Sequence, residues 1–215
     1  MRISLINAGK RFNRDWIFRN IHQEFISGLA YAITGPNGSG KSTLLQVIGG
    51  AMMMSEGSAK YMVESKPLKG PGQQQEIEID KAYQYISIAA PYLELIEEMT
   101  LLEFLQFHKQ FKPFLPTVSI PDIITAIGLK PAVNKQIRFY SSGMKQRVKL
   151  AQAIFSDVPC VLLDEPCTNL DAAGIELYHQ LIRDYCNNRL MIVSSNDEQE
   201  YSFCQERISI TDFKK

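Results

Sequence analysis

GPNGSGKST, residues 35–43, is the stretch that decides the fold of this chain. The compact apolar run LAYAIT, residues 29–34, precedes it and predicts a buried strand. Residues 42–54 follow and are apolar enough to form a helix packed on a sheet. In this order, the glycines let backbone N–H groups point at phosphate oxygens beside the positive end of the helix. The stretch therefore predicts a P-loop that grips a nucleotide phosphate.

Each position of this loop has an expected role. Lys41 supplies positive charge to the β and γ phosphates, Ser42 offers a hydroxyl ligand to Mg²⁺, and Thr43 is placed to bond a phosphate oxygen. A P-loop by itself leaves kinases, GTPases, helicases and transport ATPases open. The other expected contacts of the loop with ATP are Gly35, Pro36, Asn37, Gly38, Ser39 and Gly40.

A second motif, VLLDEP at residues 161–166, carries two adjacent acidic residues. Asp164 ends an apolar run that predicts a buried strand, where its carboxylate is expected to hold the magnesium ion. Glu165, the next residue, is expected to polarise the attacking water as a general base. Adjacent acidic residues also occur in solvated turns, but the P-loop and the apolar run favour a functional pair.

The remaining segments alternate between strand and helix patterns. Thr100 and Glu103 have the spacing of a helix capping box, and residues 66–75 are predicted to form a surface loop or hairpin tip. This alternation favours an α/β fold with a mostly parallel sheet covered by helices. The predicted strands are residues 3–6, 16–25, 83–90, 160–163, 190–194 and 208–210, and the further predicted helices are 93–111, 123–127, 142–155 and 172–186.

Composition limits the class of protein. The length of 215 residues predicts one structural unit, and 23 Lys plus Arg against 23 Asp plus Glu argue against a broad nucleic-acid surface. The four cysteines lack the spacing of zinc or dithiol motifs, so they are expected to be buried or bystander thiols. The first residues do not resemble a secretory signal and no apolar stretch is long enough to span a membrane, so a cytoplasmic location is expected.

The segment YSSGMKQRVKLAQAI, residues 140–154, resembles the signature of ABC ATPases and precedes VLLDEP, as in that family. The NLD of residues 169–171 is similar to the family's D-loop. The resemblance covers essentially the whole chain. It implies a P-loop NTPase with a RecA-like, mostly parallel sheet, an N-terminal antiparallel β subdomain and an inserted helical subdomain of about residues 92–140. These parts would form a single ABC ATPase domain, residues 1–215.

The resemblance also implies a composite nucleotide site. In this family two cassettes dimerise head to tail, so Ser141, Ser142 and Gly143 would contact the γ phosphate held by a partner cassette. A bulky side chain at Gly143 is expected to clash. Phe12 stands where the family places an aromatic residue against adenine, although it is equally explained by packing in the core. Met144 stands where the signature usually has glutamine.

Two departures from the family pattern bear on turnover. Asn196 stands where the family has its switch histidine, and an amide can donate to a phosphate oxygen but cannot carry charge or shuttle a proton. Ala89 or Ala90 replaces the glutamine expected after the preceding strand, unless a shifted loop brings in another residue or a water molecule. Binding of ATP is therefore expected to be retained better than hydrolysis.

The resemblance implies an ATP-hydrolysing subunit of an ABC transporter that powers a separate membrane-spanning subunit, with Mg²⁺ and ATP bound and with a homodimer or heterodimer of cassettes. Such a subunit would lie in the cytoplasm, peripheral to the inner face of the membrane. Residues 92–107 either form the docking groove for the membrane partner or pack the small subdomain. The alternatives are a nucleotide-dependent regulatory module with slow hydrolysis and a soluble ABC protein acting on DNA, ribosomes or iron–sulfur assembly.

Overall fold

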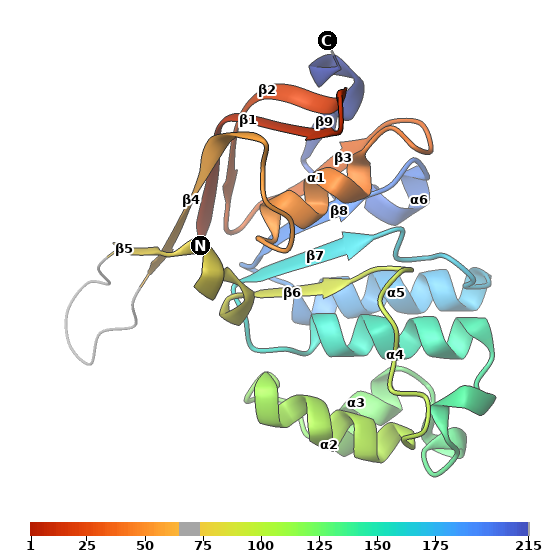
Figure 1. Cartoon of the computed structure of the whole chain (residues 1–215). Helices are drawn as coiled ribbons and strands as arrows, with labels where there is room; N and C mark the ends of the chain where they lie inside the picture. Colours follow the sequence, from red (N-terminus) through yellow and green to blue (C-terminus); the bar gives the residue numbers. More distant parts are fainter. Residues whose placement is uncertain (65–73, 215) are drawn as a thin grey trace.

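Two β-sheets organise the computed structural model, which describes residues 1–64 and 74–214 (Figure 1). The first sheet is antiparallel in the order β2-β1-β4-β5, and the second is parallel in the order β6-β7-β8-β3-β9. The strands are β1 (Arg2–Phe12), β2 (Asp15–Ile26), β3 (Ala30–Thr34), β4 (Glu56–Glu64), β5 (Gln74–Ile77), β6 (Ile86–Ala89), β7 (Cys160–Asp164), β8 (Leu190–Ser194) and β9 (Glu206–Ser209).

The two faces of the parallel sheet pack against different partners. Because side chains alternate along a strand, Val161 and Leu163 of β7 lie in one apolar cluster and Cys160 and Leu162 lie in another. Helices α4 and α5 cover the first face, and α2 packs on the side of α4 that is away from the sheet (Figure 1). Helix α1 packs between the second face and the antiparallel sheet (Figure 1). The helices are α1 (Lys41–Ile48), α2 (Leu101–Phe111), α3 (Ile120–Ala126), α4 (Ser142–Ile154), α5 (Ala172–Tyr185) and α6 (Glu198–Tyr201), with short 3₁₀ turns η1 (Ile79–Gln84), η2 (Lys130–Ala132), η3 (Ile137–Phe139) and η4 (Ile210–Phe213).

This architecture confirms the predicted fold class, including the antiparallel sheet and the mostly parallel sheet. The predicted capping box is also confirmed: Thr100 Oγ1 accepts from the amide of Glu103, whose side chain accepts from the amide of Thr100. The thiols of Cys160, Cys167 and Cys186 are buried as expected. Burial raises the pKa of Cys160 and Cys167 to about 12, so these thiols are inert.

Several predicted boundaries are wrong for physical reasons. Helix α1 ends at Ile48 rather than at residue 54, because Gly50 adopts a left-handed φ of 71° that ends the helix. Residues 93–100 are not helical, since the capping box starts α2 only at Leu101. Residues 83 and 84 end the turn η1, so strand β6 begins at Ile86.

The antiparallel strands β4 and β5 lie in segments for which no strand was predicted. Strand β4 begins with Glu56, Gly57 and Ser58, and its buried residues are only Tyr61 and Val63, so its apolar signal is short. Of the predicted loop at residues 66–75, residues 66–73 lie outside the described residues, and Gln74 and Gln75 belong to β5. Across residues 1–64 and 74–214, no helix is long and apolar enough to cross a membrane.

A buried arginine joins helix α4 to strand β7. Arg189 is 9% exposed, and its guanidinium donates to the carbonyls of Val158 at 2.9 Å, Ile154 at 2.6 Å and Ser156. Ile154 ends α4, and the other two acceptors lie in the connection that leads into β7. Since a charge at this depth requires full hydrogen bonding, the contact fixes the end of α4 relative to the sheet.

We therefore expect Arg189→Met to lower the free energy of unfolding by about 3 kcal/mol, because it leaves several buried carbonyls without a donor. Urea denaturation followed by circular dichroism measures this loss. Arg183→Met is the matched control, since the Arg183 side chain is 61% exposed in its ion pair with Glu176 and should change stability by less than about 0.5 kcal/mol. A loss below about 1 kcal/mol for Arg189→Met would contradict the structural role of this arginine.

Candidate functional site

The P-loop has a backbone conformation that its glycines make possible. Gly40, immediately before α1, has a φ of 104°, and a Cβ at this position would lie 2.3 Å from Cγ2 of Ile17. A side chain is therefore excluded both by the left-handed conformation and by close packing. The first amides of α1 have no acceptor within the helix, and they follow the loop directly. This arrangement suits an anion such as a phosphate.

Lys41 begins α1 and is 4% exposed. Its ammonium donates to the carbonyl oxygens of Gly35 at 2.9 Å and Pro36 at 3.2 Å. The lysine thus lies across the loop, with its charge at the centre of the predicted phosphate site. A cavity of about 220 Å³ opens beside it and is lined by Ile17, Asn37, Gly38, Ser39, Gly40, Lys41, Ser42, Thr43 and Glu165.

The structure brings Glu165 of the acidic pair to the cavity of this loop, and Asp164 directly precedes it. Asp164, at the end of β7, is 2% exposed, and its Oδ1 has no hydrogen-bond partner among the described residues. Ser194 lies directly opposite on β8, and its buried Oγ is likewise unpaired within that part of the chain. Buried oxygen atoms of this kind fit a hard divalent cation, which takes oxygen ligands. Glu165 adopts a left-handed φ of 43°, which is strained for a glutamate and turns the chain away from the strand.

Asn196 also meets the P-loop. Its side-chain amide donates to Oδ1 of Asn37 at 3.2 Å, across 159 residues of sequence. The segment before it pairs with the sheet, since the amide of Ser195 donates to the carbonyl of Ile33 at 3.1 Å. The sequence position expected for the switch residue therefore lies beside the P-loop, with an amide in place of an imidazole.

The segment that lacks the expected glutamine lies against the same end of the sheet. Ala89 pairs with Leu163 in the parallel ladder, so Ala90 follows at the level of Asp164. Two residues further on, Tyr92 follows Pro91 in the same segment and comes close enough to Asp164 to be affected by its charge. Burial raises the pKa of Tyr92 and the nearby Asp164 carboxylate raises it further. A tyrosine is therefore the polar side chain that this segment brings toward the acidic pair.

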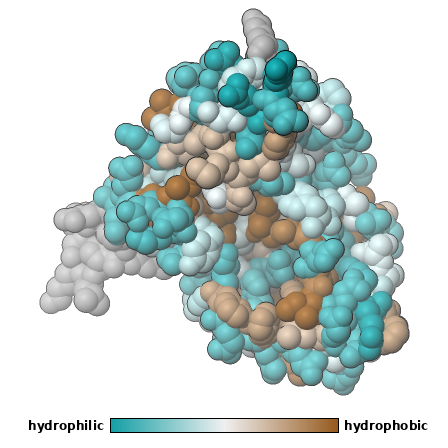
Figure 2. All heavy atoms as spheres, viewed as in Figure 1, coloured by the Kyte–Doolittle hydropathy of each residue, from teal (hydrophilic) through white to brown (hydrophobic). Residues whose placement is uncertain are grey.

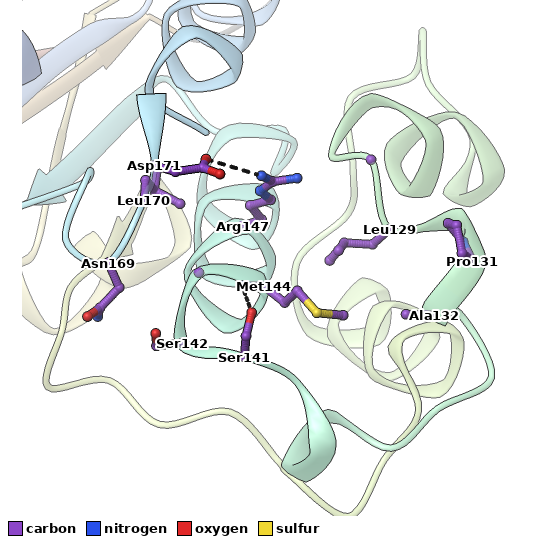
Figure 3. A pocket seen from close by; sticks show the side chains of 12 residues that line it. Leu129, Pro131, Ala132, Ser141, Ser142, Met144, Arg147, Asn169, Leu170 and Asp171 are labelled. Carbon is purple, nitrogen blue, oxygen red and sulfur yellow. Dashed lines mark hydrogen bonds and ion pairs between the residues drawn. The ribbon is translucent and has the colours of Figure 1, made fainter. Parts of the chain in front are cut away.

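The predicted signature residues line a separate pocket of about 400 Å³ (Figure 3). Ser141 is the N-cap of α4, where its Oγ accepts from the amide of Met144 at 3.2 Å. A Cβ on Gly143 would lie 2.9 Å from the carbonyl oxygen of Asn169, so this glycine is also needed for contact with the chain's own D-loop. The lining residues are Gly128, Leu129, Pro131, Ala132, Ser141, Ser142, Gly143, Met144, Arg147, Asn169, Leu170 and Asp171.

Phe12 does not pack in the core. It ends β1, its side chain is 46% exposed, and the Lys10 ammonium lies 5.0 Å from its ring centroid. The core-packing alternative for Phe12 is therefore wrong, and its contact with adenine stays a prediction. Ile17 is a hydrophobic residue that contacts the P-loop, and sequence reasoning missed it because an apolar residue in a strand carries no distinguishing signal.

Two further polar residues at the site had no assigned role. Gln146 of α4 donates to the carbonyl of Pro166 at 2.7 Å, directly after Glu165. Glu200 of α6 accepts from the amide of Cys167 at 2.7 Å and is 4% exposed. Gln146 belongs to the signature helix, which singles it out, whereas Glu200 is one acidic residue among several in a polar segment.

Comparisons with known proteins agree with this geometry. The sequence is 27% identical over 199 residues to an uncharacterized ABC transporter ATP-binding protein, YybJ of Bacillus subtilis. This alignment covers 92% of this chain and 87% of that protein. The sequence is also 27% identical over 201 residues to the cytochrome c biogenesis ATP-binding export protein CcmA of Agrobacterium fabrum, covering 92% of this chain and 90% of that protein.

Among solved structures, the ATP-binding cassette MJ0796, described as a dimer in a post-hydrolysis state bound to ADP and Pi, has the same fold. The TM-score is 0.79 at 23% identity, with 96% of this chain and 93% of that chain covered. The sequence profile of the family described as ABC transporter matches residues 18–168, which is more than half of the chain and contains the P-loop, the signature and the acidic pair. The chain therefore belongs to the ABC transporter family, as an ATP-binding cassette with the P-loop ATPase fold.

Proposed function

We propose that this cassette hydrolyses ATP and couples hydrolysis to a membrane-spanning transporter subunit, at the cytoplasmic face of the membrane. The observation that carries the hydrolytic part is the position of Glu165. This carboxylate lines the same cavity as Lys41 and Ser42, in a strained turn that directly follows Asp164. Retention of an acidic residue there favours hydrolysis over a module that only binds nucleotide.

The residues of the cavity divide the work. Lys41 and the loop amides bind the phosphates, and Thr43 bonds a phosphate oxygen. Ser42 and Asp164 are the residues that would hold Mg²⁺, which supplies charge neutralisation at the phosphate oxygens when bound. Phe12 would stack on the adenine, from its exposed place at the end of β1.

Hydrolysis then needs a water molecule in line with the bond that breaks. Glu165 accepts a proton from this water as its oxygen bonds to the γ-phosphorus, and the bond between that phosphorus and the bridging oxygen of ADP breaks. Asn196, already beside the loop through Asn37, donates its amide to a γ-phosphate oxygen. Because an amide stays neutral, it gives less charge stabilisation than a histidinium would, and turnover is correspondingly slower.

A second cassette would complete the site. The signature residues Ser141 to Gly143 lie in a pocket apart from the P-loop cavity, so one chain holds two half-sites that face different nucleotides. The dimeric state of the structurally similar MJ0796 cassette supports a head-to-tail pair of this kind. In such a pair each ATP lies between Lys41 of one protomer and Ser142 of the other.

The membrane partner would dock on the outer side of α2. Leu101, Phe104 and Leu105 of this helix are buried, whereas Phe107 is 41% and Phe111 75% exposed, with ring centroids 4.9 Å apart. Hydrophobic residues come to the surface in this region, in the lower part of the view in Figure 2. The packing interpretation of residues 92–107 thus fits the buried side chains of α2, whereas docking of the partner stays a proposal. The exposed aromatic pair, of which Phe111 lies just beyond that range, supports it because an apolar pair suits an apolar helix of a partner.

Glu165→Gln tests the hydrolytic part. We expect kcat to fall by at least about a hundredfold, because the amide cannot accept the proton from water, while the affinity for ATP stays within about threefold. Single-turnover hydrolysis and equilibrium nucleotide binding measure the two quantities. Glu176→Gln, a change in an exposed ion pair on α5, is the matched control and should leave both unchanged. Full turnover in Glu165→Gln would remove the assigned base.

Phe107→Asp tests the docking surface. We expect the purified variant to hydrolyse ATP normally. The amount of it recovered in the membrane fraction should fall by at least about tenfold, since a charge replaces an apolar contact. Met53→Asp is the control, because Met53 is also exposed, at 81%, but lies in the connection after α1. Equal recovery of Phe107→Asp and Met53→Asp would place the partner elsewhere.

A further inference from the structure

The turn that carries Glu165 is held by hydrogen bonds from neighbouring elements. The amide of Glu165 donates to the carbonyl of Ser194 at 2.9 Å, and the carbonyl of Pro166 accepts from Gln146. The amide of Cys167 donates to Oε1 of Glu200 at 2.7 Å. Because Glu165 has a strained φ of 43°, the turn keeps this shape only while such contacts over-determine it.

Glu200 is an unusual residue to find at this depth. It is 4% exposed, its Oε2 has no hydrogen-bond partner among residues 1–64 and 74–214, and its own carbonyl accepts from the hydroxyl of Tyr178 at 2.8 Å. Burial raises the pKa of this carboxyl group, which reflects the cost of placing a charge there. A leucine or alanine at this position would avoid that cost but could not accept a hydrogen bond from the amide of Cys167. That hydrogen bond is therefore the contribution that the glutamate makes.

Glu200 also belongs to the same short unit as Asn196. The amide of Asp197 donates to Oγ of Ser195 at 2.9 Å, and the amide of Glu200 donates to the carbonyl of Asp197 at 3.0 Å. Asn196 stands inside this unit and contacts Asn37 of the P-loop. The unit therefore bonds to the P-loop at one end and to the turn of Glu165 at the other.

We propose that Glu200 is a positioning residue for hydrolysis: its carboxylate accepts from the amide of Cys167 and thereby fixes the turn that orients Glu165. Asn196, in the same short unit, contacts the P-loop. This inference rests on the proposed role of Glu165 as the base. Glu200 is not among the residues that line the P-loop cavity, so we expect it to act on turnover and not on nucleotide affinity.

Four variants of the purified chain test this role. Glu200→Asp keeps the charge but is one methylene too short to reach Cys167, and Glu200→Ala removes the acceptor. Both should lower the single-turnover rate by at least about tenfold while the Kd for ATP stays within about threefold, because a displaced base loses rate without losing binding. Glu200→Gln keeps an oxygen acceptor and should hold the rate within about threefold. Tyr178→Phe removes the bond to the backbone of the same residue and should leave the rate unchanged.

Amide hydrogen exchange provides a readout that does not depend on activity. The amide of Cys167 should exchange at least about tenfold faster in Glu200→Asp than in the wild-type chain, and at the wild-type rate in Glu200→Gln. The inference is overturned if Glu200→Asp keeps the wild-type rate, if Glu200→Gln is as slow as Glu200→Asp, or if Tyr178→Phe is equally slow. Full turnover in Glu165→Gln would instead defeat the proposed base, so the two failures are distinguishable.

Discussion

The parallel pairing of β3, β8 and β7 is the constraint on which the rest of the site depends. In this register Ser194 of β8 lies beside both Ile33 of β3 and Asp164 of β7. The carboxyl ends of parallel strands share one edge, so the loops that follow them leave the sheet together. The P-loop, the Glu165 turn and the Asn196 segment meet for this reason, although they are far apart in sequence. A shift of one residue would turn the inward side chains outward and separate these loops.

The Glu165 turn is also where the signature helix joins the sheet. Helix α4 reaches the turn through the side chain of Gln146, which donates to the carbonyl of Pro166. Near the start of α4, the backbone of Gly143 packs against the carbonyl of Asn169, which follows the turn in sequence. One face of α4 thus contacts the turn of its own nucleotide site, while its N-terminus lines the separate pocket of the signature. Helix α4 is therefore joined to the turn of Glu165 by a direct side-chain hydrogen bond from Gln146 to the carbonyl of Pro166.

Much of the site was predictable because its chemistry is local in sequence. The glycines and the lysine of the P-loop lie within a few residues of one another. The two acidic residues are adjacent, and the capping box of α2 spans four residues. Strands β4 and β5 were not predicted, since Tyr61 and Val63 give β4 only a sparse apolar pattern. Ile17 and Glu200 were missed because their importance comes from contacts formed in the fold; the bond from Cys167 to Glu200 spans 33 residues. Local patterns do not encode such partners.

The position of Lys41 changes how ATP binding should be understood. Its ammonium is buried and already donates hydrogen bonds to the carbonyls of Gly35 and Pro36. If Lys41 binds phosphate as proposed, the contact is an exchange of acceptors and not the neutralisation of a solvated charge. The enthalpy released is then the difference between a hydrogen bond from the ammonium to a phosphate oxygen and one to a backbone carbonyl. Because the Lys41 side chain is already ordered by these hydrogen bonds, little rotamer entropy would be lost on binding. The ammonium would already lie close to the position that a phosphate contact requires.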